Sequence, residues 1–276
     1  MAIAGRPPLI VMGMHRSGTS LVARVLQHAG VHLGTDTNVH DESDFFREQN
    51  KRIFQLAHAD WDWPAGMQAL LEDAETREAL EEELRAACGG SGARGFLGWR
   101  RWLAARELGA QTDPWGWKDP RNTYTLPLWR RIFPEARVVN VYRDGVDVAA
   151  SLVARERKRS GRLANPIRSS RCLHPERAFE LWAEYVETSL QVTEDLGPRQ
   201  VRDVRYEALM EKPETQVREL ASFAGVELLE SEVRAAAAEV DPGRNDVRRE
   251  EPEWIELRRA RSEHPLMQRL AYGDHP

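Results

Sequence analysis

The feature that most constrains the fold of this chain is a glycine-bounded loop near its start. The apolar run PLIVM at residues 8–12 is followed by GMHRSGTS at residues 13–20 and then by LVARVLQHAG, whose apolar residues recur at helical spacing up to a glycine. A strand, a loop and a helix in this order turn backbone N–H groups and a helix N-terminus toward one anion. The pattern predicts a phosphate-binding loop; the plainer alternative is a glycine turn that closes a strand–helix unit.

The loop has the spacing of a nucleotide-triphosphatase P-loop but lacks its lysine. Thr19 stands where that motif requires Lys, the residue that would reach the β and γ phosphates. Arg16 supplies the positive charge instead. The candidate anion ligands of the loop are Arg16, Ser17, Gly18, Thr19 and Ser20.

Strand and helix patterns alternate through the rest of the chain. Residues 137–142 form a buried strand pattern, shorter strands are expected near Trp117 and at residues 200–205, and helical patterns lie between them. This alternation predicts an α/β fold with a parallel central sheet flanked by helices.

The length of 276 residues is enough for one substantial core, so we expect a single domain over residues 1–276. Residues 61–113 are expected to form a helical insertion, with helices at residues 67–87 and 96–108. The charged stretch 241–276 is expected to be irregular apart from a short last helix.

Composition argues against several functional classes. The net charge of −5 is unlike that of a general nucleic-acid binder, because phosphate-driven binding requires a basic face. No apolar run approaches the roughly 18 residues that a membrane span requires, and the first residues lack the long apolar region of a secretory signal. Cys88 and Cys172 lack metal-ligand spacing. We expect a cytoplasmic protein with no nucleic-acid or membrane partner and no metal site.

A second motif, VVNVYRDGVDVAAS, places Arg143 just after the strand at residues 137–142 and Ser151 eight residues later on a helix. Ligands of parallel sheets bind at this carboxyl edge. Together with GMHRSGTS, the motif resembles the sulfotransferase family, whose 5′-phosphosulfate loop has the form GxxRSGT[ST]. The resemblance implies a P-loop-type sulfotransferase fold with 3′-phosphoadenosine 5′-phosphosulfate (PAPS) as sulfuryl donor. It also implies that Arg143 and Ser151 bind the 3′-phosphate.

Two further segments extend the resemblance. WKDPRN is similar to a Lys-Asp-Pro segment of several sulfotransferases, which implies that Lys118 faces the transferred group; the alternative is a surface ion pair. VRYEAL is similar to the family's YE[DA]L segment, which implies that Tyr206 contacts the adenine; the alternative is a core aromatic residue.

The implied reaction is transfer of a sulfuryl group from PAPS to an acceptor hydroxyl on a saccharide, a small molecule or a tyrosyl group, leaving 3′,5′-adenosine bisphosphate (PAP). Such a transfer depends on positioning and charge stabilisation, here without a metal, and on a general base for the hydroxyl. Glu42 is our candidate for the base, with Glu48, His15 and His40 as alternatives. Glu42 also fits a helix-capping segment.

Two basic segments leave their roles open. Residues 155–171 carry many arginines among loop-forming residues and predict either a solvated surface or a clamp for an acidic acceptor. Near the C-terminus, Arg244, Arg248 and Arg249 stand where the family has a basic segment that closes on the 3′-phosphate, without reproducing it.

Two other functional classes fit parts of the sequence. In a P-loop kinase acting on a small molecule with ATP, Asp144 would hold Mg²⁺ after the strand. The second class is a nucleotide-binding protein without turnover. The missing P-loop lysine argues against the kinase, and Lys118 beside both phosphate motifs argues against the loss of turnover.

Overall fold

The computed structural model describes residues 5–159, 166–241 and 250–273. Four parallel strands form its sheet, in the order β2-β1-β3-β4. The strands are β1 (Leu9–Gly13), β2 (Gly116–Lys118), β3 (Arg137–Tyr142) and β4 (Val201–Arg205). The predicted α/β fold with a parallel sheet is confirmed.

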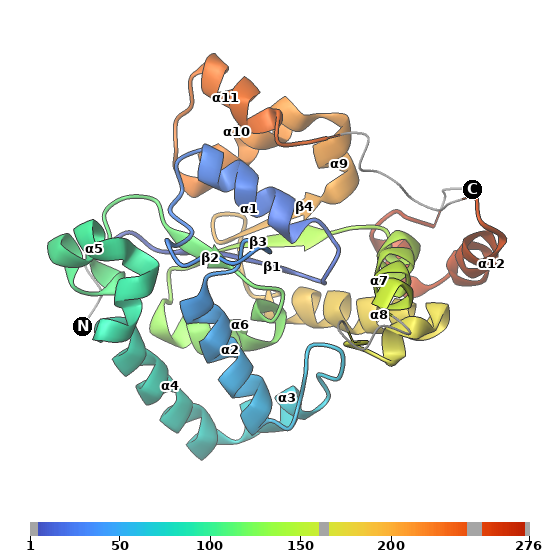
Figure 1. Ribbon diagram of the computed structural model, residues 1–276, viewed down its shortest axis with the longest axis horizontal. Helices are drawn as coiled ribbons and strands as arrows, with labels where there is room; N and C mark the ends of the chain where they lie inside the picture. Colours follow the sequence, from blue (N-terminus) through green and yellow to red (C-terminus); the bar gives the residue numbers. More distant parts are fainter. Residues whose placement is uncertain (1–4, 160–165, 242–249, 274–276) are drawn as a thin grey trace.

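Helices cover both faces of the sheet because its central strands are apolar on both sides. In β1, Leu9 and Val11 pack into one hydrophobic cluster with α1, while Ile10 and Met12 pack into the other. Figure 1 shows α1, α10 and α11 above the sheet and α2, α4 and α6 below it. The helices are α1 (Thr19–His28), α2 (Asp44–Leu56), α3 (Gly66–Glu72), α4 (Ala74–Gly89), α5 (Arg94–Ala105), α6 (Asn122–Ile132), α7 (Gly145–Arg159), α8 (Pro175–Val192), α9 (Tyr206–Glu211), α10 (Pro213–Ala224), α11 (Glu230–Ala237), α12 (Pro252–Arg261) and α13 (Pro265–Arg269).

Residues 61–113, the predicted insertion, contain a break between helices that apolar periodicity does not reveal. The single helix expected at residues 67–87 is two helices, because the side chain of Asp73 accepts a hydrogen bond from the Thr76 N–H (2.8 Å) and starts α4 afresh. Among the described residues, none of the helices combines the length and apolar character needed to cross a bilayer.

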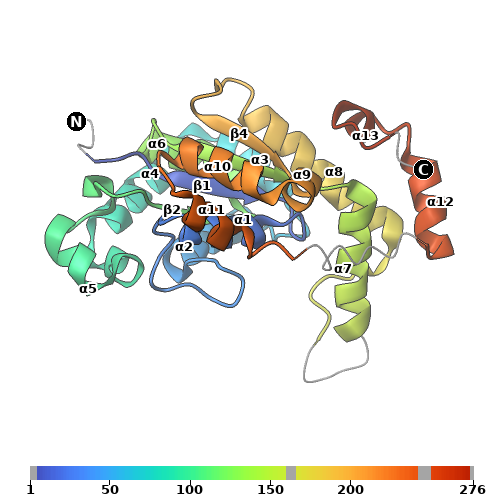
Figure 2. The same ribbon diagram turned by 90° about the horizontal axis from the view of Figure 1, so that it is seen from above.

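The prediction that residues 241–276 are irregular is wrong for the stretch that forms α12. This helix packs beside α7 and α8 (Figure 2) and buries Trp254 and Leu257. The apolar periodicity of α12 is weak. Ionic side chains contribute to its packing, because Arg157 of α7 pairs with Glu253 and Arg258 is buried. The predicted substitutes for the family's closing segment, Arg244, Arg248 and Arg249, lie outside the described residues.

Candidate active site

The loop between β1 and α1 requires its glycines. Gly13 and Gly18 have φ values of 135° and 96°, which L side chains rarely adopt. A Cβ on Gly13 would lie 2.4 Å from the Val141 carbonyl oxygen, and one on Gly18 would lie 2.4 Å from the Tyr206 ring. Arg16 also has a positive φ of 72°, an uncommon conformation for a residue with a side chain. The loop is therefore a specifically shaped turn that presses against the end of β3 and against Tyr206.

The start of α1 presents features that suit an anion. Neither an acidic side chain nor a capping side chain of the described residues occupies its first turn, so its N-terminal partial charge is not neutralised. The Ser17 hydroxyl is buried and has no hydrogen-bond partner within the described parts of the chain. A buried unpaired donor is costly and points to a ligand that would complete it.

A basic group, which we call the Arg143 cluster, lies next to this loop and consists of Arg143, Arg16, Ser151 and Tyr206. The guanidinium of Arg143 lies over the Tyr206 ring at 4.4 Å from its centroid, and Arg16 Nε donates a 2.8 Å hydrogen bond to Ser151 Oγ. Arg143 Nε is buried without a partner among the residues described. Four segments of the chain thus bring two arginines, a hydroxyl and an aromatic ring to one edge of the sheet.

Lys118 ends β2 at the same edge, and its side chain is 3% exposed. Its Nζ atom donates to the Ser20 hydroxyl (3.3 Å), the His40 carbonyl (3.0 Å) and Glu42 Oε1 (3.1 Å). These four residues form the Lys118 cluster. The alternative of a surface ion pair is wrong for Lys118, because this pair is buried against the phosphate loop.

Glu42 lies inside this cluster rather than at the helix cap. Ser43 caps α2, through a long 3.5 Å contact from the Phe46 N–H to its hydroxyl. Burial alone would raise the pKa of the Glu42 carboxyl, but the charges of Lys118 and Arg121 and the hydrogen bond from Lys118 hold it below its ordinary value. Glu42 is therefore ionised at neutral pH.

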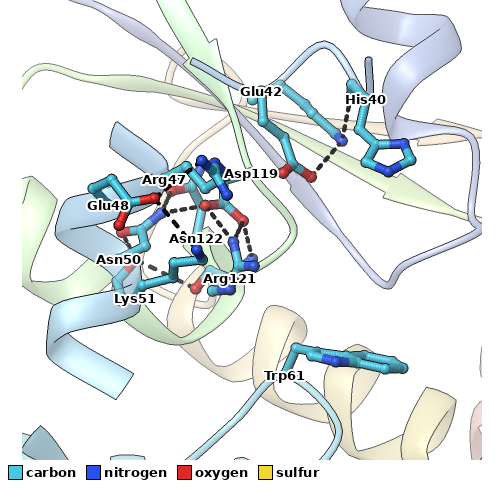
Figure 3. A network of polar contacts seen from close by, with 12 residues as sticks. His40, Glu42, Arg47, Glu48, Asn50, Lys51, Trp61, Asp119, Arg121 and Asn122 are labelled. Carbon is cyan, nitrogen blue, oxygen red and sulfur yellow. Dashed lines mark hydrogen bonds and ion pairs between the residues drawn. The ribbon is translucent and has the colours of Figure 1, made fainter. Parts of the chain in front are cut away.

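The alternative bases lie in different environments. Figure 3 shows Glu48 on α2 beside Arg47 and Lys51, with which it pairs at 3.0 and 3.3 Å on an exposed face, away from Glu42. His15 packs edge-on against Trp61, with ring centroids 4.8 Å apart, and its Nε2 is buried without a partner in the described residues. Burial, followed by nearby positive charges, lowers the pKa of His15 well below its ordinary value, so this imidazole is neutral. Burial also lowers the pKa of His40.

A buried polar network that we did not predict holds the segment after β2. Asp119 accepts from the Arg121 backbone N–H and guanidinium, both at 2.9 Å, and from Asn50 Nδ2 at 3.0 Å (Figure 3). Asn122 donates to the Val11 carbonyl of β1 at 3.0 Å. The network ties the segment that follows Lys118 to β1 and to α2. The signal in the sequence was the run of polar residues directly after a buried strand.

The basic segment at residues 155–171 begins within a helix, because α7 continues to Arg159. Arg155 lies over the Trp61 ring at 4.8 Å, and its Nε donates to the buried Glu156 at 2.7 Å. Its second terminal nitrogen is buried without a partner in the described chain. Burial, followed by the charges of Arg155 and Arg143, lowers the pKa of Arg16. Residues 160–165 of the segment lie outside the described residues.

Asp144, the magnesium ligand of the kinase alternative, has other partners. One carboxylate oxygen accepts the N–H groups of Val146 and Asp147 at 2.9 and 3.1 Å at the start of α7. The other pairs with Arg258 at 2.6 Å. The carboxylate is 1% exposed and acts as a helix cap and ion-pair partner.

The fold defines a P-loop-type α/β protein, and the loop after β1 and the Arg143 cluster form its candidate anion site. The sulfotransferase family model matches residues 7–230, and the chain belongs to that family. The resemblance on which we based the family prediction is thus confirmed. Membership and fold support sulfotransferase activity.

Two solved structures resemble the chain over nearly its whole length. The sulfotransferase domain of the Synechococcus PCC 7002 olefin synthase has a TM-score of 0.54 at 16% identity, covering 99% of this chain and 96% of that one. The sulfotransferase domain from the curacin biosynthetic pathway has a TM-score of 0.52 at 17% identity, covering 98% and 99%. At these identities the likeness shows the fold alone. No curated protein sequence matches the chain.

Proposed function

We propose that this protein transfers the sulfuryl group of PAPS to an acceptor hydroxyl in the cytoplasm and releases PAP, without a metal. One observation supports this most: at one edge of the sheet, a shaped glycine loop meets buried donors that have no partner in the described parts of the chain, with a buried lysine beside them. A donor with two separate anionic ends fits two basic groups on either side of one loop.

The donor would be held by the loop and the Arg143 cluster, where the Ser17 hydroxyl and Arg143 Nε have no partner among the described residues. The loop residues Arg16, Ser17, Gly18, Thr19 and Ser20 would bind the 5′-phosphosulfate, with the Ser17 hydroxyl gaining the acceptor it lacks. Arg143 and Ser151 would bind the 3′-phosphate, through charge-assisted hydrogen bonds. Tyr206, already flat against Arg143, would lie along the adenine.

The transfer step assigns separate roles to Lys118 and Glu42. The acceptor oxygen forms a bond to sulfur while the bond between sulfur and the bridging oxygen breaks, and PAP leaves with that oxygen. Lys118, next to Ser20 of the loop, would stabilise the charge that develops on the bridging oxygen. Glu42 would take the hydroxyl proton, and the charge of Lys118 keeps it ionised before the reaction.

The acceptor would carry an acidic group in addition to its hydroxyl. Arg155 has a buried terminal nitrogen beside the Trp61 ring that lacks a partner among the described residues, and its Nε donates to Glu156. Glu156 also accepts a hydrogen bond from the Arg168 backbone N–H at 2.8 Å, which places a second arginine near Arg155. A carboxylate or sulfate next to an apolar body would satisfy both Arg155 and Trp61.

The test is product formation from PAPS. Release of PAP would be measured with 4-nitrophenol, 4-hydroxyphenylacetate and N-acetylglucosamine as acceptor probes, with and without EDTA. We expect acceptor-dependent PAP release that EDTA does not reduce, and faster turnover with the acidic phenol than with the neutral sugar. Formation of ADP from ATP and Mg²⁺, with no PAP release, would instead support a kinase.

A further inference from the structure

Helix α12 contacts the start of α7, next to the Arg143 cluster, through one buried side chain. Arg258 donates to Asp144 Oδ2 at 2.6 Å and to Asp147 Oδ1 at 2.8 Å. Both carboxylates are 1% exposed, and Arg258 itself is 9% exposed. A single guanidinium therefore bridges the first turn of α7 to a helix more than a hundred residues later in the chain.

One of the two carboxylates lies near the side chain of Arg143, the proposed ligand of the 3′-phosphate. Asp144 is its neighbour in sequence, and Asp147 Oδ2 lies 4.0 Å from a terminal nitrogen of Arg143. The other carboxylate oxygen of Asp147 faces Arg258. Within the described residues, Arg143 and Arg258 place two positive charges against the two carboxylates, so loss of Arg258 would remove a positive charge beside the proposed 3′-phosphate site.

We propose that Arg258 is a positioning residue for the 3′-phosphate site: it neutralises Asp144 and Asp147 and so leaves Arg143 available to the phosphate. Without Arg258, Asp147 would draw Arg143 into a closer ion pair, and the carboxylate charge would repel the ligand. This inference rests on the proposed function, since it concerns the phosphate that distinguishes PAP from 5′-AMP. Arg258 lies outside residues 7–230, the part matched by the family model.

A second set of contacts links the C-terminal segment to the residues around Tyr206, the proposed adenine contact. Glu207, next to Tyr206 in the chain, accepts the Asp144 N–H at 3.0 Å and the Tyr272 hydroxyl at 2.8 Å. The described part of the C-terminal segment therefore contacts both Asp144 and the start of α9, which carries Tyr206. Its contacts converge on residues that hold Arg143 and Tyr206 in place.

The experiment compares the affinities of PAP and 5′-AMP by calorimetry in the whole protein and its variants. In Arg258→Gln we expect PAP affinity to fall about tenfold while 5′-AMP affinity changes less than about twofold. The double variant Arg258→Gln with Asp147→Asn should recover most of the PAP affinity, because the uncompensated charge is gone. Arg157→Gln is the matched control, since it breaks the exposed pair with Glu253 between the same two helices. It should leave both affinities unchanged.

The outcomes separate the inference from the proposed function. If the unaltered protein prefers PAP and Arg258→Gln keeps that preference, the inference is wrong and the proposed function stands. If both affinities fall together in Arg258→Gln and the double variant recovers neither, Arg258 has only a structural role. A protein that binds PAP no better than 5′-AMP would overturn the 3′-phosphate site and this inference with it. Arg258→Lys, which keeps the charge but cannot bridge both carboxylates, should give an intermediate loss and serves if the glutamine variant does not fold.

Discussion

The two cationic groups at the carboxyl edge of the sheet differ in how completely the protein itself satisfies them. Lys118 donates three hydrogen bonds to Ser20, His40 and Glu42. Arg143 makes one long 3.5 Å contact to the Arg16 carbonyl, a loose 4.0 Å ion pair with Asp147 and a contact with the Tyr206 ring, and its buried Nε has no partner in the described chain. All three N–H donors of Lys118 are thus used within the protein, whereas Arg143 keeps a donor for a ligand.

This difference indicates that the two clusters have different roles, one in binding the nucleotide and one in the transfer step. An incomplete buried donor gains most from a ligand that stays bound, so the Arg143 cluster should determine affinity. A saturated lysine gains little from binding unless it exchanges a partner, so the Lys118 cluster should act mainly when charge develops during transfer. The predictions below test this division, from the largest expected effect to the smallest.

Replacing Lys118 with Ala should have the largest effect on turnover. The change removes the cation at the bridging oxygen and also leaves Glu42 buried without its main partner, so we expect kcat to fall about 1000-fold. PAP affinity, measured by calorimetry, should change less than about threefold, which also shows that the variant is folded. Lys51→Ala, on the exposed face of α2, is the control. Equal turnover in Lys118→Ala would remove Lys118 from the mechanism.

Replacing Glu42 with Gln should lower kcat about 100-fold, since the amide can still accept from Lys118 but cannot take a proton. The pKa of Glu42 lies below its ordinary value, so this carboxyl stays ionised through the neutral and mildly acidic range. In the unaltered protein, kcat should therefore stay level from pH 7 down to about pH 5 as far as this group is concerned. Glu48→Gln should leave the rate unchanged. If Glu42→Gln keeps full activity and His15→Asn loses it, the base is His15.

Replacing Arg143 with Ala should lower affinity rather than rate. A charge-assisted contact is worth roughly 1.5–3 kcal/mol, so PAP affinity should fall about tenfold to a hundredfold. Turnover at saturating PAPS should change far less than in Lys118→Ala. An unchanged affinity for PAP would contradict the assignment of the 3′-phosphate site and the division between the two clusters.

The parts of this site that sequence could predict are those encoded by short-range patterns. The loop at residues 13–20 and the strand at residues 137–142 were predictable because glycine spacing and apolar periodicity are local. The resemblance singled out Lys118, but only the fold shows that it is buried against Ser20 and Glu42.

The parts that sequence could not predict depend on partners far along the chain. Arg258 is one of many arginines in a charged stretch, and its burial follows from two carboxylates more than a hundred residues earlier. The bond between Asn50 and Asp119 likewise joins segments that no periodicity connects. Such long-range ionic contacts leave little trace in the hydrophobic pattern, so the helical nature of α12 was missed.

The central claim, that the two clusters form a site for a nucleotide with a 3′-phosphate, is tested most directly by calorimetric titration of the unaltered protein. PAP, 5′-AMP and ATP with Mg²⁺ would be compared under the same conditions. We predict that PAP binds at least about tenfold more tightly than either of the others, because it alone carries the phosphate that completes Arg143. Tighter binding of ATP with Mg²⁺ would contradict the account and would make Asp144 the residue to test.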